Sequence, residues 1–191
     1  MTTDNNASLP RNWTRAELGQ IADVQLGKML DKKRIEGRPL RYLRNVNVRW
    51  GSIDTSNLLE MPFKEKELER YSLLPGDVLV CEGGEPGRAA VWQANDTKIK
   101  YQKALHRVRM SGGILPHWLV FQLYFDAQRG ALTKHFTGTT IKHFPREAFR
   151  EYPLRVAPSL EQARIVDAIE SDFTRLDDAV ATLERVQRNL K

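Results

Sequence analysis

The chain has 191 residues, with 30 Lys and Arg against 24 Asp and Glu, and therefore a net charge of +6. This length is enough for one domain of about 150 residues and an additional element, and a second full domain does not fit. The single cysteine, Cys81, excludes an intrachain disulfide and a zinc site built from several cysteines, which is consistent with a reducing compartment. The polar N-terminus lacks the apolar core of a secretion signal, and the longest uncharged apolar-rich run, residues 114–125, is too short to span a membrane.

The charge is divided unequally along the chain. Residues 158–191 hold five Lys and Arg against seven Asp and Glu, a net charge of −2, whereas the rest holds 25 against 17, a net charge of +8. A basic globular part joined to a mildly acidic helix suggests that the first part meets a polyanion and the second meets protein. We therefore expect a disordered tail (residues 1–10), a globular domain (residues 11–157) and a C-terminal helix (residues 158–191).

Spaced apolar residues between Trp13 and Val24 are expected to enter the core, and a basic loop, residues 27–39, follows them. The loop is bracketed by glycines and carries five cations against two anions. A solvated loop and a phosphate-contacting loop are about equally good interpretations, because runs of charge are often only solvated. The candidate DNA contacts in this loop are Lys28, Lys32, Lys33 and Arg34.

Residues 40–50 alternate as a strand does, with Val46, Val48 and Trp50 on one face and polar donors on the other. Arg pairs with guanine and Asn with adenine through two hydrogen bonds, so the polar face is a candidate for reading base edges. An ordinary exposed strand face is the alternative interpretation. The polar residues concerned are Arg44, Asn45, Asn47 and Arg49.

A short charged helix is predicted at residues 64–71, and residues 73–92 follow the order turn, buried strand, glycine-rich loop and second strand. A nucleotide-binding loop would require a helix after the glycines, and residues 89–92 have a strand pattern instead. Cys81 ends the first of these strands. We interpret it as an unreactive core residue, because no base is identifiable beside it.

Residues 98–103 form a second basic cluster and lead into an alternating strand at residues 104–110. Tyr101 inside this cluster could stack on a base or pack on the edge of the domain, and the sequence leaves both open. The candidate DNA contacts of the cluster are Lys100, Tyr101 and Lys103.

Pro116 opens a predicted helix at residues 117–129, whose aromatic and leucine side chains are expected in the core. A cationic loop rich in threonine follows at residues 134–144. Its hydroxyl, ammonium and imidazole groups suit phosphates and base edges, although a plain connector between helix and strand fits nearly as well. The expected core residues of the helix are Trp118, Phe121, Leu123, Tyr124 and Phe125, and the candidate contacts of the loop are Lys134, Thr137, Thr139, Thr140, Lys142 and His143.

The C-terminal helix is the most regular part of the chain. Pro158 marks its start, and Ser159 and Gln162 fit a capping box in which each side chain satisfies the other's backbone N–H. The heptad spacing of its apolar residues favours a seam that packs against a second long helix over one that packs on its own domain. The seam residues are Val166, Ile169, Phe173, Leu176, Val180, Leu183, Gln187 and Leu190, of which only Gln187 is polar.

In this order, the segments resemble one half of a DNA-specificity subunit of type I restriction-modification enzymes. The resemblance covers nearly the whole chain and rests on four stretches: residues 13–22, the strand and glycine loop at 76–88, the Thr-Gly-Thr-Thr-Ile loop at 137–141, and the proline-containing junction at 152–166. The junction is the most specific of them. The resemblance implies a mixed α/β (α+β) target-recognition domain followed by a long coiled-coil-type helix, and it adds Arg88 to the candidate DNA contacts.

Members of this family usually carry two such units, whose long helices pack antiparallel while the domains read the two halves of a split DNA site. This chain has a single unit, which implies either a half-subunit that forms an antiparallel homodimer on a palindromic site or a piece of a longer subunit. The resemblance also implies a cytoplasmic protein without a cofactor of its own. Catalysis would belong to a methylation subunit that uses S-adenosylmethionine and a restriction subunit that uses ATP and Mg²⁺.

Two other functions stay open. A DNA-modifying enzyme is disfavoured, because the chain lacks the Pro-Pro pair of amino-methyltransferases and the His-Glu-x-x-His motif, and its four histidines lack the spacing of a metal site. A dimerisation scaffold with incidental basic charge would show no salt-sensitive binding to DNA.

Overall fold

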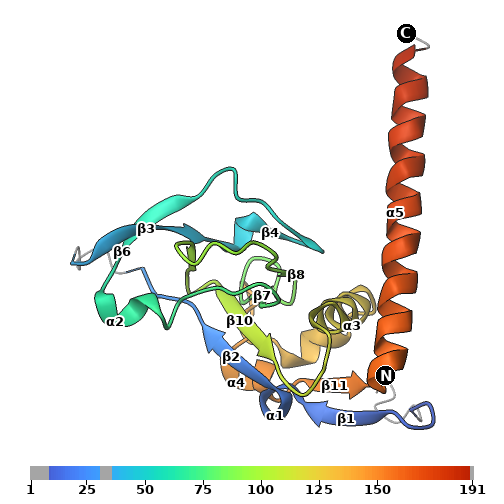
Figure 1. The fold of residues 1–191 in the computed structure, drawn as a ribbon. Coiled ribbons are helices and arrows are strands. Elements are labelled where there is room, and N and C mark those ends of the chain that lie inside the picture. The colour runs from blue at the N-terminus through green and yellow to red at the C-terminus, as the bar shows by residue number, and fades with distance from the viewer. Residues whose placement is uncertain (1–8, 31–35, 190–191) are drawn as a thin grey trace.

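The computed structural model describes residues 9–30 and 36–189. Figure 1 shows a domain of mixed helices and strands from which one long helix, α5, projects. The strands are β1 (Thr14–Glu17), β2 (Ala22–Leu26), β3 (Arg38–Leu43), β4 (Val48–Arg49), β5 (Ser52–Ile53), β6 (Leu59–Phe63), β7 (Val78–Cys81), β8 (Ala89–Val91), β9 (Lys100–Tyr101), β10 (Leu105–Met110) and β11 (Pro153–Val156). The α-helices are α1 (Leu18–Ile21), α2 (Glu65–Leu68), α3 (Pro116–Gln128), α4 (Arg146–Arg150) and α5 (Ser159–Asn189), and the 3₁₀ helices are η1 (Asn45–Asn47) and η2 (Ala131–His135).

A four-stranded sheet in the order β2-β10-β7-β8 forms the centre of the domain, and all its neighbours pair antiparallel. Successive side chains of a strand point to opposite faces, so each face of this sheet contributes to a different core. Val78 and Val80 of β7 belong to one core, and Leu79 and Cys81 belong to the other.

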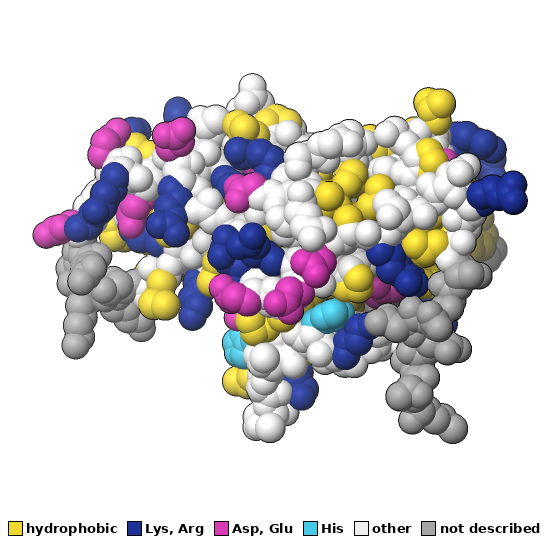
Figure 2. All heavy atoms as spheres, turned by 90° about the horizontal axis from the view of Figure 1, so that it is seen from below, with side chains coloured by type: hydrophobic (Ala, Val, Ile, Leu, Met, Phe, Trp, Pro, Cys, Tyr) yellow, Lys and Arg dark blue, Asp and Glu magenta, His cyan; other side chains and the backbone are white. Residues whose placement is uncertain are grey.

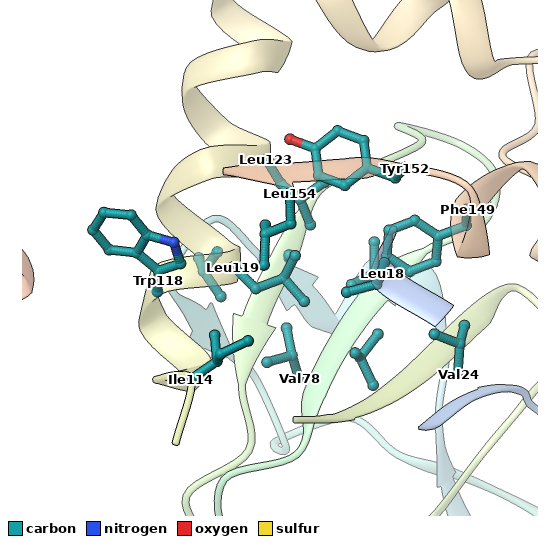
Figure 3. Packing of buried hydrophobic residues seen from close by; sticks show 14 of the residues in the cluster. Leu18, Val24, Val78, Ile114, Trp118, Leu119, Leu123, Phe149, Tyr152 and Leu154 are labelled. Atoms are coloured by element: carbon teal, nitrogen blue, oxygen red, sulfur yellow. The ribbon is translucent and has the colours of Figure 1, made fainter. Parts of the chain in front are cut away.

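The first core lies between this sheet, α3, α4, β11 and the start of α5. Figure 3 shows Trp118 and Leu119 of α3 beside the sheet, with Phe149 and Leu154 from the later part of the chain in the same cluster. The pairing of β1 with β11 brings the two ends of the domain together. The first core therefore joins the N-terminal segment to the base of the long helix.

The second core lies against the opposite face of the central sheet and is closed by a three-stranded sheet in the order β6-β3-β9. β3 pairs antiparallel with β6 and parallel with β9. Phe63, Tyr71 and Tyr101 form a chain of edge-on aromatic contacts inside it, with ring centroids 6.0 and 5.9 Å apart. This half of the domain holds two of the predicted basic clusters.

Most predicted elements are confirmed, including the strands β7, β8 and β10 and the helices α3 and α5. The strand predicted at residues 40–50 is interrupted: β3 ends at Leu43, the turn η1 follows, and Val48–Arg49 form the separate strand β4. The cause is Asn47, which is 3% exposed. Its side-chain oxygen accepts the N–H of Arg44 at 2.9 Å, and its amide donates to the carbonyl of Asp54 at 3.0 Å, so it folds the chain into a turn. The helix predicted at residues 64–71 is also shorter than expected.

The packing of α3 differs from the prediction at one aromatic residue. Trp118 and Leu123 are buried and Phe121 is half-buried, as an amphipathic helix requires. Phe125 is 49% exposed, because it lies on the solvent side of α3, where the guanidinium of Arg129 lies 5.2 Å from its ring centroid. The prediction that Phe125 is a core residue is therefore wrong.

The start of α5 is held by a buried amide instead of the predicted capping box. Gln162 is 1% exposed, donates to the carbonyl of Ala157 at 2.8 Å and accepts the N–H of Leu115 at 3.1 Å. The N–H groups of Glu161 and Gln162 donate to the carbonyl of Pro158. The first turn of α5 is thus fixed to the loop before α3. In the described ranges, no helix has the length and apolarity needed to cross a bilayer.

Candidate nucleic-acid interface

The glycine-rich loop after β7, residues 82–88, is connected to η1 by two candidate DNA-binding side chains, Asn45 of η1 and Arg88 of the loop itself. Asn45 donates through its amide to the carbonyl of Gly83 at 3.2 Å, and Arg88 donates to the carbonyl of Asn45 at 3.0 Å. Arg88 also pairs with Glu85 at 2.6 Å, and its side chain is only 12% exposed. Gly84 has a φ of +83°, and a Cβ there would collide with the Asn45 amide, so this close approach requires glycine. The side chains of Asn45 and Arg88 therefore donate hydrogen bonds within the domain.

The other polar residues of the strand predicted at residues 40–50 also differ in whether they make internal contacts or face solvent. Asn47 is buried, so the prediction that it contacts DNA is wrong. The guanidinium of Arg44 donates to the carbonyl of Asn57 at 2.8 Å. Arg49 is exposed, whereas Arg44, Asn45 and Asn47 are half-buried or buried. Most of the side-chain donors that could contact bases thus form internal hydrogen bonds that stabilise η1 and the glycine-rich loop.

The cluster at residues 98–103 is mostly interior. Lys100 is 3% exposed and donates to the carbonyls of Leu68 at 2.9 Å and Thr97 at 2.7 Å, and burial lowers the pKa of its ammonium group. Tyr101 is fully buried in the second core, and burial raises the pKa of its hydroxyl. The predictions that Lys100 and Tyr101 contact DNA are therefore wrong, because β9 is an inner-facing edge strand paired with β3. Lys103 is exposed.

Of the four candidate DNA contacts in the basic loop, Lys28 is the one that the structure describes. Its ammonium group lies 2.5 Å from Glu67 and 2.7 Å from the carbonyl of Pro62, and it lies 4.9 Å from the ring centroid of Phe63. These contacts connect β6 and α2 to the end of β2. The positive charge of Lys28 is thereby paired with the carboxylate of Glu67. The other three candidates of this loop, Lys32, Lys33 and Arg34, lie outside the described residues.

The threonine loop, defined here as residues 137–143, is the candidate segment that stays exposed. Thr137 and His143 form two backbone hydrogen bonds of 2.9 Å that close it at its base. Gly138 has a φ of +88°, and a Cβ there would collide with the carbonyl of Ile141, so the closure requires glycine. The side chains between the two ends point to solvent, and Ile141 is 65% exposed. The exposed candidates of this loop are Thr137, Thr139, Thr140 and Lys142, and Lys134, just before it in η2, is exposed as well.

The fold brings the threonine loop onto the glycine-rich loop. His143 and Gly83 form an isolated antiparallel bridge, and the N–H of Phe144 donates to the carbonyl of Glu82 at 2.7 Å. Nδ1 of His143 lies 3.0 Å from the carboxylate of Glu82. Sequence reasoning missed Glu82, because it stands 61 residues from His143 and no spacing rule links them. Tertiary structure alone reveals this pair.

The surface charge forms no uniform basic area on the side that Figure 2 shows. Seen from below Figure 1, Lys and Arg side chains lie interleaved with Asp and Glu. Among residues 9–30 and 36–189, no cluster of three or more His, Cys, Asp or Glu residues could hold a metal ion. Among the candidate contacts, the cations that the structure leaves exposed are Arg49, Lys103, Lys134 and Lys142.

The seam of α5 is covered by its own domain only at its beginning. Val166 is 5% exposed and belongs to the first core, so its assignment to a subunit interface is wrong, and Ile169 is half-buried. Phe173 is 44% exposed where α5 leaves the domain. The following seam residues are uncovered, with exposed fractions of 60% for Leu176, 53% for Val180 and 69% for Leu183, and Gln187 is also exposed. Leu190 lies outside the described residues.

A groove with a volume of about 690 Å³ lies where α5 diverges from α3. Aromatic side chains of three segments line it, namely Trp50, Phe121, Tyr124 and Phe173, and Glu170 and Asp177 of α5 form its acidic edge. The uncovered seam continues outward from this groove.

Comparison with known proteins gives one sequence relative and several structures of the same fold. The specificity subunit of the type I restriction enzyme EcoBI of Escherichia coli is 23% identical over 195 residues, which cover 96% of this chain and 37% of that subunit. No protein-family model matches the chain. The chain therefore spans well under half the length of this curated relative.

The solved structures agree with this result. A structure of a type I restriction-modification system, described for its complex assembly and conformational transition, superposes with a TM-score of 0.72 at 19% identity, over 97% of this chain and 45% of that one. The HsdS subunit of Thermoanaerobacter tengcongensis gives 0.62 at 18% identity, over 97% and 42%. The S subunit from M. genitalium gives 0.58 at 17% identity, over 95% and 43%.

These matches confirm the mixed α/β fold with a long C-terminal helix. They cover nearly all of this chain and less than half of each relative. Over nearly its whole length the chain is therefore similar in sequence to part of the EcoBI specificity subunit, and it shares the fold of part of the solved type I structures.

Proposed function

We propose that the chain is a non-catalytic half-subunit that dimerises through α5 and directs a type I restriction-modification complex to a split palindromic DNA site. The observation that carries this proposal is the uncovered apolar seam of Leu176, Val180 and Leu183, on a chain whose fold matches 45% of a chain from a type I restriction-modification system. Three apolar side chains that are more than half exposed on one helix stripe are costly in water, so a second helix is the natural partner.

Charge along α5 favours antiparallel pairing of two copies. Residues 159–178 hold six Asp and Glu against two Arg, whereas residues 179–189 hold one Glu against two Arg. A parallel pair would place the two acidic halves side by side, and an antiparallel pair places each acidic half near the basic end of the other copy. One antiparallel register sets Phe173 opposite Leu183 of the partner subunit and Leu176 opposite Val180 of the partner subunit.

The length of α5 then sets the separation of two recognition domains. Its 31 residues extend about 46 Å at roughly 1.5 Å per residue, which exceeds the roughly 34 Å of one DNA turn. Two domains related by two-fold symmetry would read inverted half-sites and leave the bases between them unread. The threonine loop, Arg49 and Lys103 are the proposed DNA contacts of each domain, and Arg44, which is half-buried, is the proposed contact at the edge of η1.

The proposed partners are double-stranded DNA, a second copy, a methylation subunit and a restriction subunit in the cytoplasm. S-adenosylmethionine would bind to the methylation subunit, and ATP and Mg²⁺ would bind to the restriction subunit. This chain would act by positioning the methylation subunits over an adenine in each half-site.

The experiment that tests the proposal is methylation mapping of DNA from cells that express the chain with its methylation subunit. We expect a new methylated motif made of two inverted half-sites with an unread spacer. A motif with two unrelated halves would contradict the homodimer, and unchanged methylation together with no DNA binding by the complex would contradict the proposed function.

A further inference from the structure

The contact between Glu82 and His143 lies at the base of the threonine loop and is directed partly to solvent. The carboxylate oxygen and Nδ1 lie 3.0 Å apart, and the side chains are 16% and 44% exposed, respectively. The carboxylate is thus largely covered, whereas the imidazole is nearly half exposed. The buried carboxylate of Glu82 can therefore fix the orientation of the more exposed imidazole of His143.

The orientation of this ring is held by several independent contacts. The bridge between Gly83 and His143 and the hydrogen bond from the N–H of Phe144 to the carbonyl of Glu82 fix the backbone on both sides. The ring lies against the backbone of Gly83, where a Cβ would stand 3.2 Å from Nδ1. The neighbouring Glu85 is engaged with Arg88 at 2.6 Å and is not available to the imidazole. Of the carboxylates that the structure describes, Glu82 is the one hydrogen-bonded to the ring.

When the imidazole is neutral, the carboxylate also decides which ring nitrogen carries the proton. An ionised carboxylate only accepts hydrogen bonds, so Nδ1 of His143 must be the donor at 3.0 Å. In a neutral imidazole the other nitrogen, Nε2, then has a lone pair and is an acceptor. Within the described part of the chain, Nε2 of His143 has no hydrogen-bond partner, so the acceptor is open to a ligand.

We infer that His143 is a specificity-determining residue whose Nε2 accepts a hydrogen bond from the exocyclic amino group of a base, and that Glu82 is the positioning residue that sets this polarity. The inference rests on the proposed DNA-recognition function and deepens it. In the major groove, amino donors occur only on adenine N6 and cytosine N4. Guanine O6 and N7 and thymine O4 are acceptors and would face the lone pair of Nε2 unfavourably. Each recognition domain should therefore prefer adenine or cytosine at one position.

The test uses the full chain assembled with its methylation subunit and a library of duplexes with randomised half-sites. We expect the wild-type complex to prefer an amino-bearing base at one position of each half-site by roughly 5- to 150-fold, the range of one base-edge contact. His143→Ala should abolish the preference at that position and leave the other positions unchanged. Replacing the selected adenine by purine, or the selected cytosine by a pyrimidine analogue without the amino group, should weaken the wild-type complex and leave His143→Ala unaffected.

Glu82→Gln separates the positioning role from a merely structural one. The amide can donate to Nδ1 as well as accept from it, so Nε2 loses its fixed polarity and the preference at that position should fall about tenfold. Glu147→Gln is the matched control, because its side chain is 80% exposed and its contact with Arg146 is long, at 3.9 Å. It should leave the base profile unchanged.

The outcomes distinguish this inference from the function on which it rests. A wild-type complex that selects no sequence overturns the proposed function, and this assignment with it. If the wild type selects a sequence and both Glu82→Gln and His143→Ala select it with an unchanged profile, only the present assignment is overturned. It is overturned as well if His143→Ala and the more conservative His143→Gln both lose their cooperative unfolding transition, because the role of the residue would then be structural.

Discussion

Phe173 of α5 stacks on Phe121 of α3, with ring centroids 6.3 Å apart and an angle of 28° between the planes. This contact stands at the end of the groove where the helix separates from its domain. Before it, Val166 is packed in the first core, and beyond it Leu176, Val180 and Leu183 are more than half exposed. One heptad seam is thus divided, because its first part fixes the helix to the domain and its second part is the exposed surface that we propose as the contact with another helix.

Two acidic substitutions in the free part of the seam, Leu176→Asp with Leu183→Asp, should abolish self-association and assembly with the methylation subunit. Each pair of copies would lose four apolar side chains from the interface and gain four charges in it, which should weaken association by at least roughly a thousandfold. Sedimentation velocity at micromolar concentration measures the effect. Ser171→Asp with Thr182→Asp adds the same charge on the opposite, exposed face and is the matched control. Unchanged sedimentation and assembly of the seam variant would refute the seam assignment.

Removal of the Asp77 carboxylate should destabilise the domain. Asp77 is 1% exposed, accepts hydrogen bonds from Arg109 at 2.7 and 2.8 Å and accepts the N–H of Leu74 at 2.8 Å. Asp77→Ala leaves these donors without a partner, so we expect a loss of about 2 to 4 kcal/mol in the free energy of unfolding. Chemical denaturation measures it. Glu147→Ala, which removes an exposed carboxylate, should cost less than about 1 kcal/mol, and an equal loss in both variants would contradict the argument.

Cys81 should be unreactive in the folded protein and should make stability sensitive to alkaline pH. It is fully buried, and burial raises the pKa of its thiol from 9.0 to about 11. At pH 8 a thiol reagent should therefore label the native chain only as fast as it unfolds, whereas the denatured chain should be labelled at once. Labelling of native protein at the rate of a free thiol would contradict the burial of this residue.

The same pKa difference sets the direction of the stability change. The buried thiol stays protonated in the folded chain while the unfolded chain loses its proton, so its contribution is fully present below about pH 9 and is lost as the pH rises towards 11. The difference in the free energy of unfolding between wild type and Cys81→Ala should shrink by about 2 kcal/mol between pH 8 and pH 10.5. A difference that is independent of pH would contradict the raised pKa.

Binding of DNA by the assembled complex should depend strongly on salt. Neutralisation of about six phosphates gives a slope near roughly −5 in a plot of log affinity against log salt concentration. Arg49→Ala with Lys142→Ala should reduce the slope by about 2, because both side chains are exposed. Lys28→Met is the control, since this ammonium group is already paired with Glu67, and it should leave the slope unchanged. A wild-type slope near zero would exclude phosphate contacts by the basic residues.

The sequence was sufficient for features that depend on local pattern. The heptad spacing and Pro158 predicted α5 to within a few residues, because a long amphipathic helix is determined by its own periodicity. Pro116 and the apolar run after it predicted α3 for the same reason. The buried strand, glycine loop and second strand at residues 73–92 were predicted because alternation and glycine act over only a few residues.

The sequence was not sufficient to decide which polar side chains face DNA. Asn45, Asn47, Arg88 and Lys100 look like free donors in the sequence, and in the structure each satisfies a backbone carbonyl from another part of the chain. A buried carbonyl must find a donor, and only the path of the whole chain determines which side chain supplies it.

The sequence by itself determined the long helix, the basic domain, the order of elements and the resemblance to one half of a specificity subunit. Tertiary structure decided how these parts are used. It placed Val166 in the core and left Leu176 and Leu183 exposed, and it brought Glu82 to His143 across 61 positions. The physical reason is that burial and hydrogen-bond partnership belong to pairs of residues that the fold brings together, whereas periodicity and charge belong to the chain itself.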